Sequence, residues 1–274
     1  MKPRLVPLLT LLLASSLFAQ QDPTARSWNQ PVEPFRIAGN VYYVGASDIT
    51  SYLITTPKGH IVLDGGFEET APMILANIEK LGFRVKDVRI LLSSHAHYDH
   101  AAGLGELKRV TGAKFYSSRG DLPAHARGGL DDPQFGNRFP YPPIMADRIL
   151  EDGERVTLGG TTLVAHLTPG HTPGCTTWTT RIGNRNVVFL GSTTVPSSYR
   201  LENNPRYPNA IADYRAQFAK LKTLGCDIFL ASHGNFFGLA DIIAKKKSLA
   251  GCDEYRAFVR DSERRFEERV AKGE

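Results

Sequence analysis

Four side chains that can bind a metal ion lie within six residues, in the segment His95-Ala96-His97-Tyr98-Asp99-His100. The segment follows the mostly apolar run 88–93, which predicts a buried strand that ends just before the histidines. On an extended backbone, His95 and His97 point to the same side, and the turn that follows brings Asp99 and His100 around a second point. The chain has 8 histidines in 274 residues, so three in one short loop are not expected by chance. The pattern indicates a metal site rather than a polar loop with coincidental histidines.

Neutral imidazole and carboxylate ligands favour Zn²⁺ over Mg²⁺ and Ca²⁺, which prefer shells of oxygen atoms. Two further histidines follow predicted strands. His171 lies in the turn TPGHTPG at 168–174, whose glycines and prolines fix the backbone. His233 follows the apolar strand 228–231 and precedes Gly234. Taken alone, each could be an ordinary turn histidine, but beside the first cluster each can supply a missing ligand.

The motifs HAHYDH at 95–100, TPGHTPG at 168–174 and SHG at 232–234 resemble the metallo-β-lactamase superfamily. The similarity extends from Trp28 to the segment NPRYP at 204–208 and the helix after it, which is nearly the whole mature chain. The resemblance implies two zinc ions per chain. Their ligands would be His95, His97 and His171 for the first zinc, and Asp99, His100 and His233 for the second.

The position after the apolar run 187–190 separates members of this superfamily. Glyoxalase II-like hydrolases place a bridging aspartate there, and the first two β-lactamase subclasses place a cysteine. This chain has Gly191-Ser192-Thr193-Thr194, without either residue. It therefore resembles the third subclass of class B β-lactamases, which implies that Ser192 and Thr194 hydrogen-bond the substrate carboxylate. Their hydroxyls could equally satisfy local backbone groups in a turn.

The resemblance implies hydrolysis of penicillin-type and carbapenem-type antibiotics by a zinc-bound hydroxide. Zinc lowers the pKa of a bound water from 15.7 to about 7, so no serine nucleophile is required. Asp99 would be both a ligand and the group that orients or accepts the proton of the water. Asp64, at the end of the strand 61–63, is expected to support a metal-bound histidine, because such histidines donate their other N–H to a carboxylate or carbonyl. Capping of the turn at Gly65-Gly66 is the alternative role.

The first residues are typical of a secretory signal peptide, which we expect at 1–19. Lys2 and Arg4 precede an apolar stretch at 8–13 that is too short to span a bilayer, and small residues follow. Removing Lys2 and Arg4 takes two charges from a net +5 and leaves +3, which favours neither nucleic acid nor anionic lipid as a partner. We expect a periplasmic or secreted protein that is a monomer, acts on a small molecule and has no membrane association after cleavage.

The chain has three cysteines, and an exported protein would meet an oxidising compartment in which two of them could form a disulfide. Cys226 and Cys252 lie on either side of a helical-looking segment and could pair in an oxidising compartment. The pairing also fits the disulfide seen in parts of the third subclass. Cys175 is left over and is expected to be a buried free thiol.

The order of expected elements predicts an α+β fold of a single domain at 20–274. Short β runs at 35–37, 41–44, 51–54 and 61–63 are followed by alternating helices and strands, and a second β-rich stretch at 155–190 is again followed by helices. Helices are expected at 70–81, 104–110, 211–224 and 253–272. Two successive β-then-α halves predict two sheets packed face to face with helices outside, a four-layer αββα sandwich.

The other histidines are assigned no chemistry. His60 and His166 are expected to be packed structural residues, and His125 is expected to be exposed. The segment 131–144, rich in Pro, Phe and Tyr, is a candidate cover over the site, and Trp28 is a candidate wall.

Two other functions compete with a β-lactamase. A di-metal hydrolase of the same fold could cleave a lactone or a thioester, although the missing bridging aspartate argues against it. The chain could also be an exported zinc-binding protein without turnover, although all six ligand positions and Asp99 are present.

Overall fold

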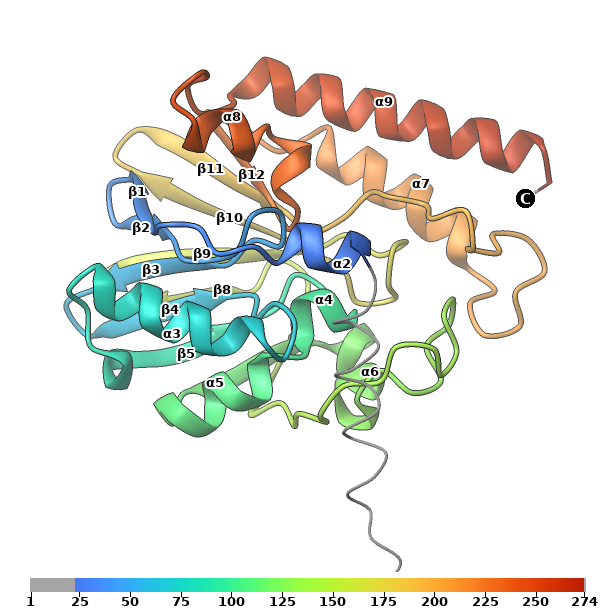
Figure 1. Ribbon diagram of the computed structural model, residues 1–274. Helices are drawn as coiled ribbons and strands as arrows, with labels where there is room; N and C mark the ends of the chain where they lie inside the picture. Colours follow the sequence, from blue (N-terminus) through green and yellow to red (C-terminus); the bar gives the residue numbers. More distant parts are fainter. Residues whose placement is uncertain (1–22, 274) are drawn as a thin grey trace, which may run out of the picture.

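The computed structural model describes residues 23–273, so the expected signal peptide at 1–19 lies outside the described residues. In the described part, two β-sheets pack face to face and helices cover both outer faces (Figure 1). This is the predicted αββα sandwich of the α+β class. Within residues 23–273, no helix is both long enough and apolar enough to cross a membrane.

The first sheet has seven strands in sequence order, antiparallel from β1 to β4 and parallel from β4 to β7. Alternation along its strands divides the core into two layers. Tyr52 and Ile54 face the second sheet, whereas Leu53 between them packs beneath the outer helices. The strands are β1 (Phe35–Ala38), β2 (Val41–Tyr43), β3 (Tyr52–Thr56), β4 (Gly59–Leu63), β5 (Val88–Leu92), β6 (Lys114–Ser118) and β7 (Arg148–Leu150).

The second sheet has the order β12-β11-β10-β9-β8, antiparallel except for the parallel pair β11 and β12. The two sheets meet through aromatic side chains, including Tyr52 and Phe189, whose ring centroids are 5.0 Å apart. The strands are β8 (Arg155–Leu158), β9 (Thr161–Leu167), β10 (Thr176–Ile182), β11 (Arg185–Leu190) and β12 (Ile228–Ala231).

Helices α3 and α5 cover the first sheet, and α7 and α9 cover the second (Figure 1). The four long helices lie within a few residues of their predicted positions. The shorter helices at the ends of loops were not predicted as such. The helices are α2 (Pro23–Trp28), α3 (Thr70–Lys80), α4 (Tyr98–Ala101), α5 (Leu104–Thr111), α6 (Leu122–Arg127), α7 (Ala210–Leu221), α8 (Leu239–Ile243) and α9 (Cys252–Ala271).

Two expectations from the sequence are wrong in this structure. His125 is buried rather than exposed, because α6 presses its ring edge-on against Phe115, with the centroids 4.9 Å apart. Cys226 and Cys252 are both free thiols, so the expected disulfide is not formed. Cys175 is a buried free thiol, as predicted. His60 is buried against Phe83, which also agrees with its expected structural role.

Candidate metal centre

The segment that carries His95 to His100 leaves the carboxyl end of β5, and three of the backbone carbonyls at its start accept hydrogen bonds from distant parts of the chain. The backbone N–H of Thr176 donates to the Ser94 carbonyl at 2.7 Å. The Trp178 indole donates to the Ser93 carbonyl at 3.0 Å, and the Tyr141 hydroxyl donates to the Ala96 carbonyl at 2.7 Å. Strand β10 of the second sheet and the segment 131–144 therefore fix the position of this loop.

His95, His97 and His171 form a buried three-histidine cluster, as predicted. His97 Nδ1 and His171 Nε2 lie 3.0 Å apart. The His95 ring is edge-on to both, with centroids 5.0 and 4.7 Å away. His95 Nε2 is fully buried and has no hydrogen-bond partner among the described residues. Buried polar nitrogens are normally satisfied, and a metal ion bound by the three imidazoles would satisfy this one.

The turn at 168–174 aims His171 into this cluster. His171 Nδ1 lies 2.9 Å from the Thr194 carbonyl and can donate its proton there, which leaves Nε2 free as a ligand. Gly170 has φ of 142°, and a Cβ at this position would lie 2.8 Å from the Tyr214 ring. Only glycine fits this turn without strain.

Asp99, His100 and His233 form a second group, the mixed cluster. His100 Nε2 lies 3.3 Å from His233 Nε2 and 3.4 Å from Asp99 Oδ2, and His233 Nε2 lies 3.5 Å from the same carboxylate oxygen. Tetrahedral zinc with ligands at about 2.0–2.2 Å separates its ligand atoms by about 3.3–3.6 Å. The three atoms therefore already have the spacing that zinc requires. The two clusters adjoin, since the ring centroids of His95 and His100 are 4.2 Å apart.

Two carboxylates face the Nδ1 atoms of the histidines in the mixed cluster, on the side away from the Nε2 atoms. Asp48 Oδ2 lies 2.9 Å from His233 Nδ1, and Asp48 Oδ1 accepts the backbone N–H of Asn235 at 2.7 Å. Asp64 is buried; its Oδ1 accepts the N–H of Ser94 at 2.6 Å, and its Oδ2 lies 3.7 Å from His100 Nδ1. The latter distance is too long for a hydrogen bond but allows strong electrostatic attraction. Both carboxylates favour the tautomers that leave Nε2 free.

The two clusters differ in charge: the mixed cluster contains charged side chains, whereas His95 in the three-histidine cluster is neutral. Burial alone would raise the pKa of Asp99, but His100 and His233 outweigh it and hold the pKa well below its usual range. Burial alone would lower the pKa of His100, but Asp99 and Asp64 raise it to about 10. The mixed cluster therefore attracts positive charge. Burial lowers the pKa of His95, so this ring offers a neutral lone pair to a metal.

Ser192 and Thr194 lie at the edge of the three-histidine cluster. Ser192 is buried, and its hydroxyl lies 3.2 Å from the Thr194 hydroxyl. The Thr194 hydroxyl in turn lies 3.2 Å from His171 Nδ1. Both hydroxyls therefore lie beside the three-histidine cluster, and their role in binding substrate stays a prediction.

Aromatic side chains from three segments surround the clusters. Trp28 packs edge-on against His233, with ring centroids 5.3 Å apart. Phe135, from the segment proposed as a cover, lies 4.9 Å from His97. Tyr199 stacks on His171 at 5.5 Å, and its hydroxyl donates to the His171 carbonyl at 3.1 Å. These side chains form apolar walls around a polar centre, an arrangement typical of small-molecule sites.

The sequence model of the metallo-β-lactamase superfamily matches residues 44–233, which is more than half of the chain and includes all six clustered side chains. The chain belongs to the metallo-β-lactamase superfamily. It is therefore a hydrolase of this superfamily, and its buried histidine and aspartate side chains form groups that could hold a divalent metal ion.

Solved structures of β-lactamases in this superfamily share nearly the whole fold. The FEZ-1 metallo-β-lactamase from Legionella gormanii is 41% identical, with a TM-score of 0.86 over 89% of this chain and 98% of that one. BJP-1, a subclass B3 metallo-β-lactamase of Bradyrhizobium japonicum, is 36% identical, with a TM-score of 0.84 over 93% and 98%. The chain is thus similar to subclass B3 enzymes.

Curated relatives of the superfamily are more varied. A probable metallo-hydrolase of Burkholderia pseudomallei is 35% identical over 40% of this chain and 36% of its own length. A hydroxyacylglutathione hydrolase of Rhodospirillum rubrum is 33% identical over 38% and 32%. An N-acyl homoserine lactonase of Azorhizobium caulinodans is 27% identical over 63% and 75%. The first of these matches span only about a third of the relatives' own length.

Sequence reasoning did not find Asp48, Asp121, Asp132 or Tyr199. Asp121 is buried and links the two ligand segments: it accepts the N–H groups of Ala96 at 2.9 Å and of Gly174 at 2.8 Å. Burial raises its pKa to about 6. Asp132 Oδ2 lies 3.5 Å from His97 Nε2. An acidic residue just after a buried strand, as at Asp121, is the signal that could have been used.

Proposed function

We propose that this protein is an exported β-lactamase that uses two zinc ions to hydrolyse the amide bond of β-lactam antibiotics. The observation that carries the proposal is the segment Gly191–Thr194, which places hydroxyls and no carboxylate or thiol beside the metal ligands. The similarity to solved β-lactamases over about nine-tenths of the chain supports it. The signal-like residues 1–19 support a periplasmic or secreted location.

Each cluster fits one zinc ion. His95 Nε2, His97 Nδ1 and His171 Nε2 would hold the first, and Asp99 Oδ2, His100 Nε2 and His233 Nε2 the second. When bound, zinc supplies a Lewis acid for the lactam carbonyl and a hydroxide at neutral pH. The acceptors that face Nδ1 of His171 and of His233 favour the tautomers in which Nε2 offers its lone pair to a metal.

Asp99 is suited to move the proton that hydrolysis requires. Its carboxylate is ionised at neutral pH because His100 and His233 lower its pKa. It can therefore orient the attacking water and take its proton at a carboxylate oxygen. The water oxygen bonds to the carbonyl carbon, the ring C–N bond breaks, and the proton is delivered to the nitrogen. Water is thus added across the amide without a covalent enzyme intermediate.

The remaining side chains would bind the substrate. The Thr194 hydroxyl is half-buried and faces the ligand His171, so it can donate to the carboxylate of a β-lactam. Ser192 holds the Thr194 hydroxyl through a contact of 3.2 Å and can reach the substrate through water. Trp28 and Phe135 can pack against the apolar rings of the antibiotic.

A lactonase or thioesterase is the second candidate, favoured by the matches to an N-acyl homoserine lactonase and to hydroxyacylglutathione hydrolases. Those matches are lower in coverage or identity than the matches to β-lactamases. A zinc-binding protein without turnover is the third candidate.

The test is a steady-state panel with metal content measured on the same sample. Penicillin, cephalosporin and carbapenem substrates are compared with a homoserine lactone and a glutathione thioester. The proposal predicts hydrolysis of β-lactams that a chelator abolishes and Zn²⁺ restores, with His97→Ala as the inactive control. Faster turnover of the lactone or thioester would favour the second candidate, and no turnover of any substrate would favour the third.

A further inference from the structure

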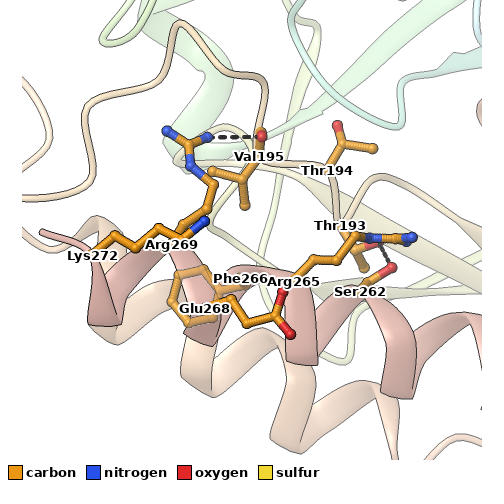
Figure 2. Close-up of a pocket in the computed structure, with 9 residues that line it drawn as sticks. All are labelled: Thr193, Thr194, Val195, Ser262, Arg265, Phe266, Glu268, Arg269 and Lys272. Carbon is orange, nitrogen blue, oxygen red and sulfur yellow. Dashed lines mark hydrogen bonds between the residues drawn. The ribbon is translucent and has the colours of Figure 1, made fainter. Parts of the chain in front are cut away.

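Arg269 ties the C-terminal helix α9 to the segment beside the metal ligands. Its guanidinium donates to three backbone carbonyls: Val195 at 2.9 Å, Pro196 at 2.6 Å and Tyr199 at 3.0 Å. Figure 2 shows the side chain reaching from α9 across a cleft to the Val195 carbonyl. Three carbonyls from one loop converge on one planar cation, which has five donors in a fixed fork.

The segment that Arg269 holds touches the three-histidine cluster at both ends. At one end, the Thr194 carbonyl lies 2.9 Å from His171 Nδ1 and accepts the Tyr214 hydroxyl at 2.7 Å. At the other end, the Tyr199 hydroxyl lies 3.3 Å from His97 Nε2. Between these contacts, the loop has no helix or strand that would fix it. Arg269 supplies that restraint from outside the site.

We propose that Arg269 is a positioning residue for the metal centre, acting through the loop from Thr194 to Tyr199. It keeps the Thr194 carbonyl where it selects the tautomer of His171, and it keeps the Tyr199 ring stacked on that histidine. Its three hydrogen bonds to the loop end on backbone carbonyls and not on any of the six ligands. Replacement of a residue that hydrogen-bonds a metal ligand directly commonly changes metal affinity or activity 10- to 100-fold. Arg269 acts through such residues, so we expect an effect near the lower end of that range.

The adjacent Arg265 provides a matched control on the same helix. It lines the same cleft, one turn away from Arg269 (Figure 2), and pairs with Asp261 on its own helix. Replacing Arg265 removes a cation from the same cleft and leaves the three hydrogen bonds from Arg269 to the loop in place. A general effect of charge on the cleft would therefore be the same in Arg265→Ala and Arg269→Ala.

The experiment compares purified Arg269→Ala, Arg269→Lys and Arg265→Ala with the wild-type protein. Zinc affinity is measured by competition with a chelator, and the Co²⁺-substituted proteins are compared by visible absorption. We expect Arg269→Ala to bind the first zinc about tenfold more weakly, with an altered Co²⁺ spectrum. Guanidinium ion at tens of millimolar should restore part of the loss, and Arg265→Ala should match the wild type. If Arg269→Ala does not fold, Arg269→Lys keeps the charge and stem and should show a smaller loss.

The inference rests on the proposed function only for its activity measurement, in which kcat on a β-lactam should fall more than KM rises. The zinc and Co²⁺ measurements need no substrate. If the wild type hydrolyses no β-lactam, the proposed function fails while these measurements still decide the role of Arg269. Wild-type zinc affinity and Co²⁺ spectrum in a folded Arg269 variant, even one with a lower Tm, would overturn the inference.

Discussion

The substitution Asp48→Asn tests whether the Asp48 carboxylate sets the tautomer of His233, and so leaves its Nε2 free to bind a metal. As a carboxylate, Asp48 accepts from Asn235 N at 2.7 Å with one oxygen and faces His233 Nδ1 at 2.9 Å with the other. An asparagine has one accepting oxygen. If that oxygen keeps the Asn235 bond, the amide NH₂ faces Nδ1 and favours the tautomer protonated at Nε2. Nε2 is the atom that lies 3.5 Å from Asp99 Oδ2 and that would bind the metal in the proposed site.

The expected loss of zinc affinity follows from removing the carboxylate that faces His233 Nδ1. Replacing a carboxylate behind a metal-bound histidine costs 10- to 100-fold in affinity, or about 1.4–2.8 kcal/mol. The loss should be confined to the mixed cluster. His171 in the other cluster is oriented by the Thr194 carbonyl, which Asp48 does not touch.

The assay is a stepwise zinc titration against a chelator, followed through the fluorescence of Trp28, which packs on His233. Asp227→Asn is the control, because Asp227 also accepts a backbone N–H, at 2.7 Å from Asn186, but is exposed and lies at the opposite end of β12 from His233. We predict that Asp48→Asn weakens zinc binding only in the titration step that belongs to the mixed cluster. Equal weakening of both steps, or of neither, would refute the reasoning.

Further predictions concern buried side chains. Burial lowers the pKa of His125 to about 3 against 6.5 when unfolded, so its contribution to stability is lost as the pH falls below 6.5. Between pH 7.5 and 5 the wild type should lose about 2 kcal/mol more than His125→Leu in urea unfolding at fixed zinc. Burial raises the pKa of Cys175, so a thiol reagent should modify Cys252 in the folded protein and Cys175 only after unfolding. Tyr199→Phe should lower first-site zinc affinity severalfold in chelator competition.

The long elements were predictable because their hydrophobic period is strong. The predicted helix at 70–81 is α3 (Thr70–Lys80), and the predicted strand at 88–93 is β5 (Val88–Leu92). Short elements such as α6 and β7 depend on tertiary contacts that a local pattern does not contain. The prediction that His125 is exposed was wrong for this reason. Its burial depends on Phe115, which lies ten residues away on another element.

The candidate metal ligands were predictable because several histidines and an aspartate close together in a short segment have few roles other than metal binding. All six are brought together in the structure. The groups that support them were mostly missed, because a lone aspartate such as Asp48 or Asp121 is common in loops and only the fold reveals its partner. Arg269 is the extreme case, since nothing in the helical sequence of α9 indicates a role at the site.

The most direct test of the account is anomalous diffraction from crystals of the zinc-loaded protein, recorded on both sides of the zinc absorption edge. We predict two peaks per chain, one bonded to the three-histidine cluster and the other to the mixed cluster. One peak alone, or a peak that leaves any of the six side chains unbonded, would contradict the assignment on which the proposed chemistry depends.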